Sequence, residues 1–142
     1  MARLSHIGLT VSNLDRSLTF YRDVAGMNEG AIVEGENRQS GTPTRMRMIH
    51  LASGSFLLQL IEYNPPGVKL QLAQNNIGCT HISFYVPDVE AKYAEVKSRG
   101  DVKITTPINQ MGNALRGFYT EDPDGFPVEF VQSLKATRGA DG

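Results

Sequence analysis

The pattern of apolar and polar positions in the first half of the chain returns in the second half. Residues 5–15 (SHIGLTVSNLD) and 80–90 (THISFYVPDVE) align without a gap. In both segments alternating apolar and β-branched residues predict a strand, and each strand leads to a residue that can cap a helix, Asn13 or Asp88. The chain therefore contains a duplicated unit that begins with a strand and a helix.

A segment with apolar residues at helical spacing follows each of the two predicted strands. Apolar residues recur every three or four positions, at Leu14, Leu18, Tyr21 and Val24 or Ala25 in the first half and at Val89, Tyr93 and Val96 in the second. A glycine, Gly26 or Gly100, stands where each helix is expected to end. The period changes from two to 3.6 residues at equivalent places in the two halves.

Each half closes with a predicted hairpin. The segments 56–62 (FLLQLIE) and 126–132 (FPVEFVQ) match, and each follows a turn sequence and another apolar segment, 45–51 or 115–121. Adding the runs near 28–35 and 102–108 gives the order strand, helix, strand, strand, strand, twice. We expect an α+β fold of two tandem βαβββ modules in one domain, 1–142, with module one at about 3–63, a connector at 64–78 and module two at about 79–134.

Composition narrows the class of protein. A chain of 142 residues, 40% hydrophobic, has about the size of one ordinary domain. Its 14 basic and 15 acidic residues are scattered and give a net charge of -1, which argues against nucleic acid and anionic membranes as partners. The single cysteine, Cys79, excludes an intrachain disulfide and is expected to be a small buried hydrophobe. The first residues have no long apolar stretch, so we expect a soluble, cytoplasmic protein.

Polar residues occupy matching positions in the two halves. His6 aligns with His81, and Gln59 aligns with Glu129. In a strand, Gln59 and Glu129 would each face away from the apolar residue that follows. A buried carboxylate without a partner is costly, whereas four such groups can satisfy one another by sharing a cation if the modules pack with pseudo-two-fold symmetry.

Structural explanations exist for each of these residues taken singly. A strand-borne histidine is usually a hydrogen-bonded structural residue, and a partly buried glutamine such as Gln59 often satisfies backbone groups. Glu62 is another carboxylate close to Gln59 that could be considered as a ligand. It is expected on the opposite face of the strand from Gln59, and an exposed position at the end of the strand explains its charge more simply. His50 aligns with Thr120 and is expected to be a surface or pocket residue. Two histidines at equivalent repeat positions are less easily explained in this way.

The duplicated module, the histidine that opens each half, the segment DPDGFPVEF (122–130) and the placement of Gln59 resemble the vicinal oxygen chelate superfamily. This superfamily includes glyoxalases, methylmalonyl-CoA epimerases, fosfomycin-resistance transferases, ring-cleaving dioxygenases and bleomycin-binding proteins. The resemblance spans about residues 3–134. It implies a cupped mixed β-sheet around a divalent metal ion, with ligand positions at His6, Gln59, His81 and Glu129.

This donor set suits Zn, Co, Ni, Mn or Fe. Glutamine at the second position resembles methylmalonyl-CoA epimerase and implies an isomerase or lyase that acts on a small molecule with adjacent oxygens through an enolate, with Glu129 as ligand or as base. The resemblance also implies a homodimer. The alternatives are a metal-free binding or resistance protein and a non-heme iron dioxygenase of the extradiol type, which would require Gln59 to stay off the metal.

The sequence leaves open which residues bind the substrate. The epimerase pattern has a carboxylate base on the strand aligned with 45–51, where this chain has Arg47. Arg45 and Arg47 share one face of that strand, and Met46, Met48 and His50 share the other. Either the arginines bind an anionic substrate group or the methionines line the pocket. Further pocket candidates on the matching strand of the second half are Phe118 and Tyr119.

Overall fold

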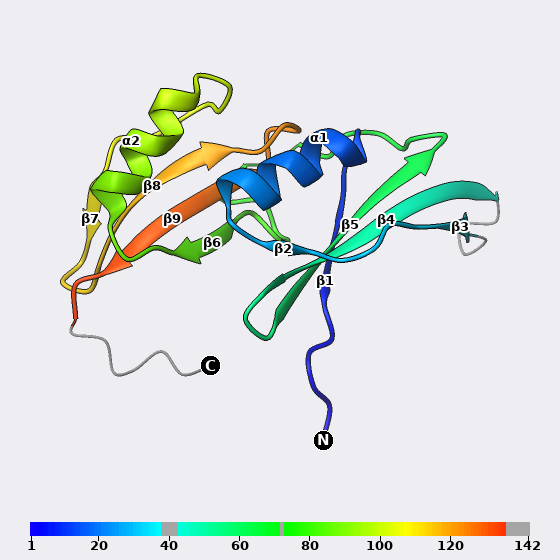
Figure 1. Cartoon of the computed structure of the whole chain (residues 1–142), viewed down its shortest axis with the longest axis horizontal. Helices are drawn as coiled ribbons and strands as arrows, with labels where there is room; N and C mark the ends of the chain where they lie inside the picture. The colour runs from blue at the N-terminus through cyan, green and yellow to red at the C-terminus, as the bar shows by residue number, and fades with distance from the viewer. Residues whose placement is uncertain (38–42, 72, 136–142) are drawn as a thin grey trace. The chain divides into compact units, whose positions relative to one another are not determined.

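The computed structural model describes residues 1–37, 43–71 and 73–135, and the chain divides between Leu70 and Gln71 into two compact units. Each unit has one β-sheet and one helical segment that follows its first strand (Figure 1). The structure therefore confirms the α+β class and the tandem arrangement of βαβββ modules.

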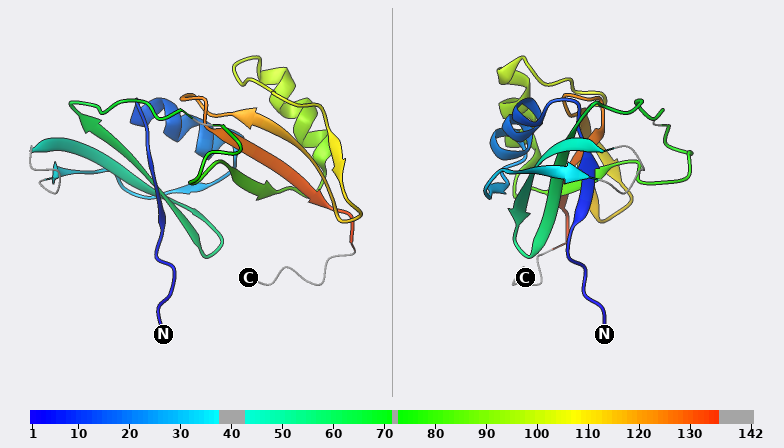
Figure 2. Two further views of the ribbon diagram at one scale, coloured as in Figure 1. Left: turned by 180° about the vertical axis from the view of Figure 1, so that it is seen from behind. Right: turned by 90° about the vertical axis from the view of Figure 1, so that its right-hand side faces the viewer.

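The first unit is built on a long antiparallel hairpin (Figure 2). Its elements are β1 (Ile7–Thr10), α1 (Leu14–Thr19), the π-helical segment η1 (Phe20–Val24), β2 (Asn28–Glu29), β3 (Val33–Asn37), β4 (Thr44–Ser53) and β5 (Phe56–Asn64). The sheet order is β1-β5-β4-β2, and β3 also pairs with β4. Strand β1 runs parallel to β5, and the other pairs are antiparallel.

The helical segment of the first unit follows the predicted pattern. The Asn13 side chain accepts a hydrogen bond from the Arg16 N–H, which caps α1. The predicted apolar face is buried through α1 and η1, and Gly26 ends it with φ of 77°. Beneath the helix lie Leu58 and Leu60 of β5, which are at most 1% exposed.

The second unit repeats this plan. Its elements are β6 (Ile82–Tyr85), α2 (Val89–Arg99), β7 (Asn109–Met111), β8 (Leu115–Glu121) and β9 (Pro127–Ser133), in the sheet order β6-β9-β8-β7. Asp88 caps α2 by accepting from the Ala91 N–H, and Gly100 ends the helix with φ of 73°. In Figure 1, α2 lies along one face of the β8–β9 pair.

The two units share the same strand register. Gly8 of β1 lies opposite Gln59 of β5, and Ser83 of β6 lies opposite Glu129 of β9. Both pairs are parallel, and each belongs to a ladder of four registered positions. The aligned segments 5–15 and 80–90, and likewise 56–62 and 126–132, therefore take equivalent places in the two sheets.

Two of the predicted strands differ from the structure. The run near 28–35 is divided between β2 and β3. The run 102–108 forms no continuous strand; it contributes the isolated bridge between Ile104 and Thr120, with a hydrogen bond from the Thr105 N–H to the Tyr119 carbonyl at 2.9 Å. Pro107 has no N–H to donate, which limits continuous pairing there, and β7 begins two residues later.

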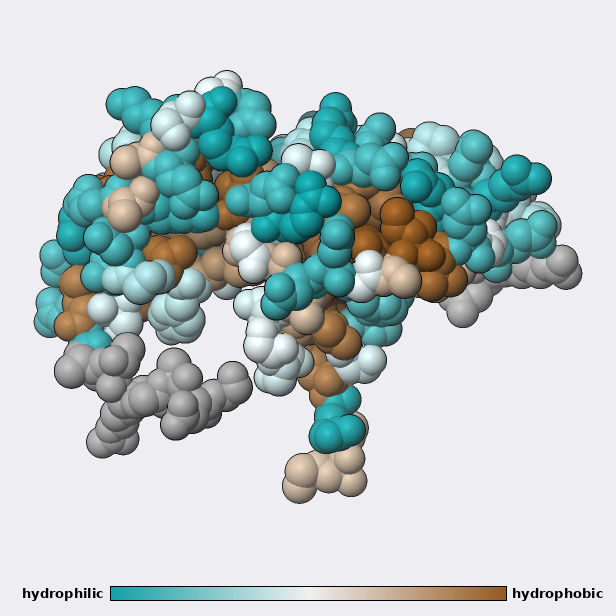
Figure 3. Space-filling model, in the orientation of Figure 1, coloured by the Kyte–Doolittle hydropathy of each residue, from teal (hydrophilic) through white to brown (hydrophobic). Residues whose placement is uncertain are grey.

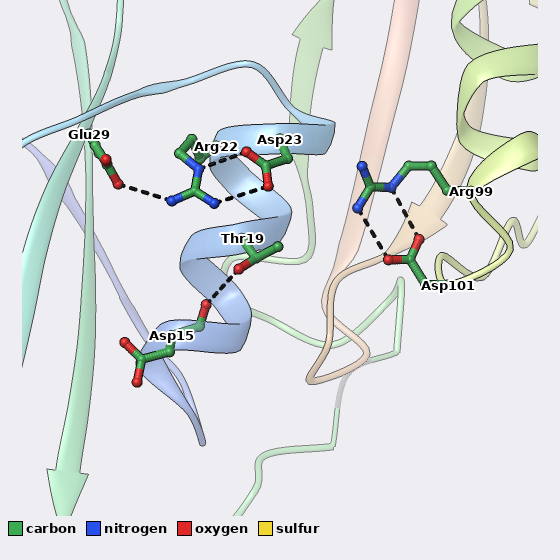
Figure 4. Close-up of polar contacts among 7 residues, drawn as sticks. All are labelled: Asp15, Thr19, Arg22, Asp23, Glu29, Arg99 and Asp101. Carbon is green, nitrogen blue, oxygen red and sulfur yellow. Dashed lines mark hydrogen bonds and ion pairs between the residues drawn. The ribbon is translucent and has the colours of Figure 1, made fainter.

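Exposed ion pairs lie near the ends of the helical segments (Figure 4). Arg22 Nε lies 2.7 Å from Asp23 Oδ1, and Arg22 Nη1 lies 3.4 Å from Glu29 Oε2. After α2, Arg99 Nε lies 3.1 Å from Asp101 Oδ1. Solvent screens such pairs, so they contribute little to stability.

The outward faces of α1 and α2 are hydrophilic (Figure 3). No helix in the described part of the chain is both long enough and apolar enough to cross a membrane. The apolar residues of each helix instead face its own sheet, as the buried Leu14 and Val89 show.

Candidate functional site

Alternation along β5 and β9 separates a helix-covered face from a second face that carries the candidate residues. On the helix side, Glu62 Oε2 accepts a hydrogen bond from the Leu14 N–H at 2.5 Å, and Gln132 Oε1 accepts one from the Val89 N–H at 3.0 Å. These side chains satisfy the first free N–H of each helix. Gln59 has the opposite parity from Glu62, so it lies on the other face of its sheet.

In the first unit, that second face brings Gln59 together with the chain's third histidine. His50 of β4 lies directly opposite Gln59, and Gln59 Nε2 is 3.2 Å from His50 Nε2 and 3.3 Å from Met48 Sδ. The His50 ring meets the His6 ring edge to face, with their centroids 5.2 Å apart. His6 and Gln59 are therefore joined through His50.

The second unit has an equivalent cluster. Tyr119 of β8 lies directly opposite Glu129 of β9, which is the same register relation as His50 to Gln59. The His81 ring meets the Tyr119 ring edge to face at a centroid distance of 5.7 Å. Glu129 is buried, with 6% of its surface exposed. Each unit thus places one aromatic ring beside both a predicted histidine ligand and a predicted carbonyl or carboxylate ligand.

Both predicted histidine ligands are oriented by the residue that precedes them. Ser5 Oγ lies 3.0 Å from His6 Nδ1, and Thr80 Oγ1 lies 3.2 Å from His81 Nδ1. Each histidine stands one residue before its strand begins. A partner at Nδ1 leaves Nε2 as the nitrogen that can bind a metal ion, which is a common arrangement in metal sites.

Burial and the Glu129 carboxylate, through its charge and a hydrogen bond, raise the pKa of the Tyr119 hydroxyl above 10.0, with burial as the largest cause. A phenol that remains protonated can keep donating to a carboxylate beside it. The Tyr119 hydroxyl therefore keeps its proton beside Glu129 at neutral pH.

In chelator-treated protein, Glu129→Gln should lower the Tyr119 pKa towards its ordinary value without restoring it fully. The substitution removes the negative charge that opposes phenolate formation, while burial continues to raise the pKa. An ultraviolet absorbance titration between pH 9 and 12, with Tyr119→Phe to identify the signal, measures this change. An unaltered Tyr119 titration would contradict the contact.

A cavity of about 200 Å³ opens beside His81 and Tyr119 in the second unit. It is lined by Ala73, Gln74, Thr80, His81, Thr105, Thr106, Tyr119 and Pro127. Hydroxyl and amide groups dominate its polar lining, so it can receive a small oxygen-bearing group.

The remaining predicted substrate residues lie on different faces. Arg47 lies opposite Glu62 on the helix side, with Nη1 3.6 Å from Asp15 Oδ2 of α1 and Nε 3.4 Å from Glu34 Oε1 of β3. Met48 lies on the Gln59 side. The structure therefore decides the orientation that the sequence left open: the methionine face accompanies the candidate ligands.

Only one of the two aromatic candidates on β8 accompanies Glu129. Phe118 is fully buried and packs edge to face on Tyr93 of α2, with ring centroids 5.1 Å apart. It belongs to the core, whereas Tyr119 faces Glu129. Cys79, expected to be buried, is exposed.

The pairings of His50 and Glu62 were not predicted from the sequence. The alignment matched His50 with Thr120, but the register makes Tyr119 its equivalent, because the chain between Tyr119 and Glu129 is one residue longer than the chain between His50 and Gln59. The role of Glu62 had a detectable signal, since it aligns with Gln132 and both side chains carry an acceptor for a helix N–H. The recurring Ser–His and Thr–His dipeptides were a similar signal.

The donor chemistry of each unit fits half of a metal site. Among the residues that the structure describes, no three His, Cys, Asp or Glu side chains gather closely enough to hold an ion. Each unit nevertheless supplies an imidazole whose Nδ1 is already engaged and, beside it, an amide or carboxylate group. These are donor types that divalent transition metals accept.

Comparison with known proteins identifies the family. The model of the Glyoxalase/Bleomycin resistance protein/Dioxygenase superfamily matches residues 3–130. The chain is 30% identical to a lactoylglutathione lyase of Neisseria meningitidis, over 92% of this chain and 90% of that protein. It is 29% identical to a probable lactoylglutathione lyase of Vibrio cholerae, over 99% and 97%.

A solved structure gives the same result for the fold. A glyoxalase family protein from Bacillus cereus superposes with a TM-score of 0.81 at 16% identity, covering 95% of this chain and 96% of that one. The extent of the family match and the agreement of the folds lead to one conclusion: the chain belongs to the glyoxalase/bleomycin resistance protein/dioxygenase superfamily.

Proposed function

We propose that this protein is a divalent-metal-dependent isomerase or lyase that acts on a small molecule with adjacent oxygens. His6 and Gln59 from the first unit and His81 and Glu129 from the second are the proposed ligands. The observation that carries the proposal is the repeated arrangement of a histidine engaged at Nδ1 and an amide or carboxylate at the same register position in each unit.

The charge of this donor set suits proton-transfer chemistry. Two imidazoles and one amide are neutral, so Glu129 supplies the only negative charge and a divalent site remains net positive. A bound ion of this kind would polarise adjacent substrate oxygens and stabilise enolate charge. The relatives named lactoylglutathione lyase support this class of reaction and make lactoylglutathione one candidate substrate.

The chain's own groups have separate roles in this proposal. Glu129 is buried beside the Tyr119 phenol, which hydrogen-bonds to its carboxylate. In the reaction, the carboxylate takes a proton from a carbon next to a carbonyl and returns it to the neighbouring carbon. The cavity beside His81 and Tyr119 receives the oxygen-bearing end of the substrate.

The proposal is tested by calorimetric titration with Zn, Co, Ni, Mn and Fe(II), followed by deuterium exchange from solvent. The candidate substrates are lactoylglutathione, a 2-oxo acid, a hydroxy-ketone and an acyl-thioester. We expect stoichiometric metal binding and metal-dependent exchange at the carbon beside the carbonyl. Failure to bind any of these ions would favour a metal-free protein that sequesters its ligand. Oxygen consumption with a catechol would favour a dioxygenase.

Gln59→Glu should tighten metal binding and slow turnover. A second carboxylate adds ligand charge, but it also reduces the net positive charge available to an enolate in the transition state. Metal affinity by competition with a chelating dye and exchange rate by NMR measure the two effects separately. Tighter binding combined with faster exchange would contradict the proposed chemistry.

A further inference from the structure

We propose that His50 is a positioning residue that holds the Gln59 side chain with its carbonyl oxygen turned towards β1, the strand that His6 precedes. This inference rests on the proposed function, because it concerns how Gln59 is presented to a cation. A carboxamide has a donor end and an acceptor end, and only the oxygen can bind a metal ion. Its orientation therefore decides whether Gln59 attracts or repels the ion.

The contacts of the amide nitrogen determine this orientation. Gln59 Nε2 lies 3.2 Å from His50 Nε2 and 3.3 Å from Met48 Sδ. A thioether sulfur has no hydrogen to donate, so the group facing Met48 must be the amide NH₂. The same NH₂ then donates to His50 Nε2.

With its nitrogen held by β4, the amide turns its oxygen to β1. A methyl group built on Gly8 would lie 3.7 Å from Gln59 Oε1, so the oxygen lies above this glycine. Gly8 is opposite Gln59 in the ladder and lies two residues after His6, which stands just before β1. The His50 ring also meets the His6 ring, which places both predicted ligands of the first unit around one imidazole.

Comparison of Gln59 with Glu129, its equivalent in the second unit, indicates why Gln59 needs an orienting partner. Tyr119 takes the equivalent register position beside Glu129. A carboxylate has two equivalent oxygens and presents an acceptor whichever way it turns, whereas the terminal torsion of glutamine has two opposite settings. The hydrogen-bond acceptor of His50 next to Gln59 selects the amide orientation in which the oxygen points away from β4.

The first test uses His50→Phe, which keeps an aromatic ring against His6 and removes the acceptor nitrogen. We expect Co(II) and Zn(II) to bind about 10-fold more weakly, at the lower end of the effects of removing partners that orient metal ligands. The matched control is the same substitution in a Gln59→Glu background. There we expect less than a twofold change, because a carboxylate does not need to be oriented. Equal weakening in both backgrounds, or no weakening in the parent background, would overturn the proposal.

The second test requires no metal. In chelator-treated parent protein, nuclear Overhauser contacts should join the Gln59 side-chain NH₂ protons to the His50 ring and the Met48 methyl group, and His50→Phe should remove this preference. Contacts from those protons to the Gly8 Hα instead would show the opposite orientation and overturn the inference. If the parent binds no divalent ion, the proposed function fails, and these contacts alone decide whether His50 orients the amide.

Discussion

Replacing His81 by alanine should weaken binding of a divalent ion by more than about 100-fold, and His6→Ala should do the same. Removing a partner that only orients a ligand costs about 10–100-fold, and loss of the ligand itself costs more. Both histidines are exposed and stand just before their strands, so the substitutions leave the packed cores intact. Calorimetric titration, or competition with a chelating dye, measures the affinity.

The chain supplies its own control for this experiment. His50 is the third histidine and is not a proposed ligand, so His50→Phe should cost much less than either alanine substitution. Circular dichroism should show unchanged secondary structure in all three variants. Parent-like metal affinity in both His6→Ala and His81→Ala would refute the assignment of these histidines as metal ligands.

Phe130→Ala should lower the free energy of unfolding by about 3–5 kcal/mol, which is the usual cost of truncating a buried phenylalanine. Phe130 is fully buried on the helix side of β9, with its ring centroid 5.6 Å from Phe118 and 6.0 Å from Phe84. Lys92 Nζ of α2 lies 5.2 Å from the centre of the ring. The substitution therefore removes contacts with both strands and the helix. Urea unfolding followed by circular dichroism measures the change.

Tyr85→Ala is the matched control, because this aromatic residue of β6 is 77% exposed. It should change stability by no more than about 0.5 kcal/mol. A loss at Phe130 no larger than the loss at Tyr85 would mean that β9 is not the centre of the second unit's core.

Much of the fold was predictable because local chemistry and the repeat agreed. Asn13 and Asp88 cap their helices in both the prediction and the structure, because a side-chain acceptor before an apolar helical pattern satisfies free N–H groups locally. The segment 102–108 was mispredicted since its apolar alternation suggested a strand, whereas strand formation also requires a partner able to pair along its length.

Alternation along β5 and β9 likewise showed which residues share a face. It placed Gln59 apart from Leu60 and Glu129 apart from Phe130, and the burial of the two apolar residues agrees. Alternation does not show which face a helix covers. Arg47 illustrates this difference, because its face became known only through its contacts with α1 and β3.

The sequence by itself determined the duplication, the order of the main strands and helices, the helix caps and the parity of the candidate ligands. These properties depend on neighbours within a few positions or on comparing one half with the other. Only the tertiary structure decided that His50 faces Gln59, that Tyr119 faces Glu129 and that Glu62 reaches the first N–H of α1. Partners across a hairpin depend on the length of chain that joins them, and one extra residue between β8 and its partner positions in β9 shifts the match from Thr120 to Tyr119.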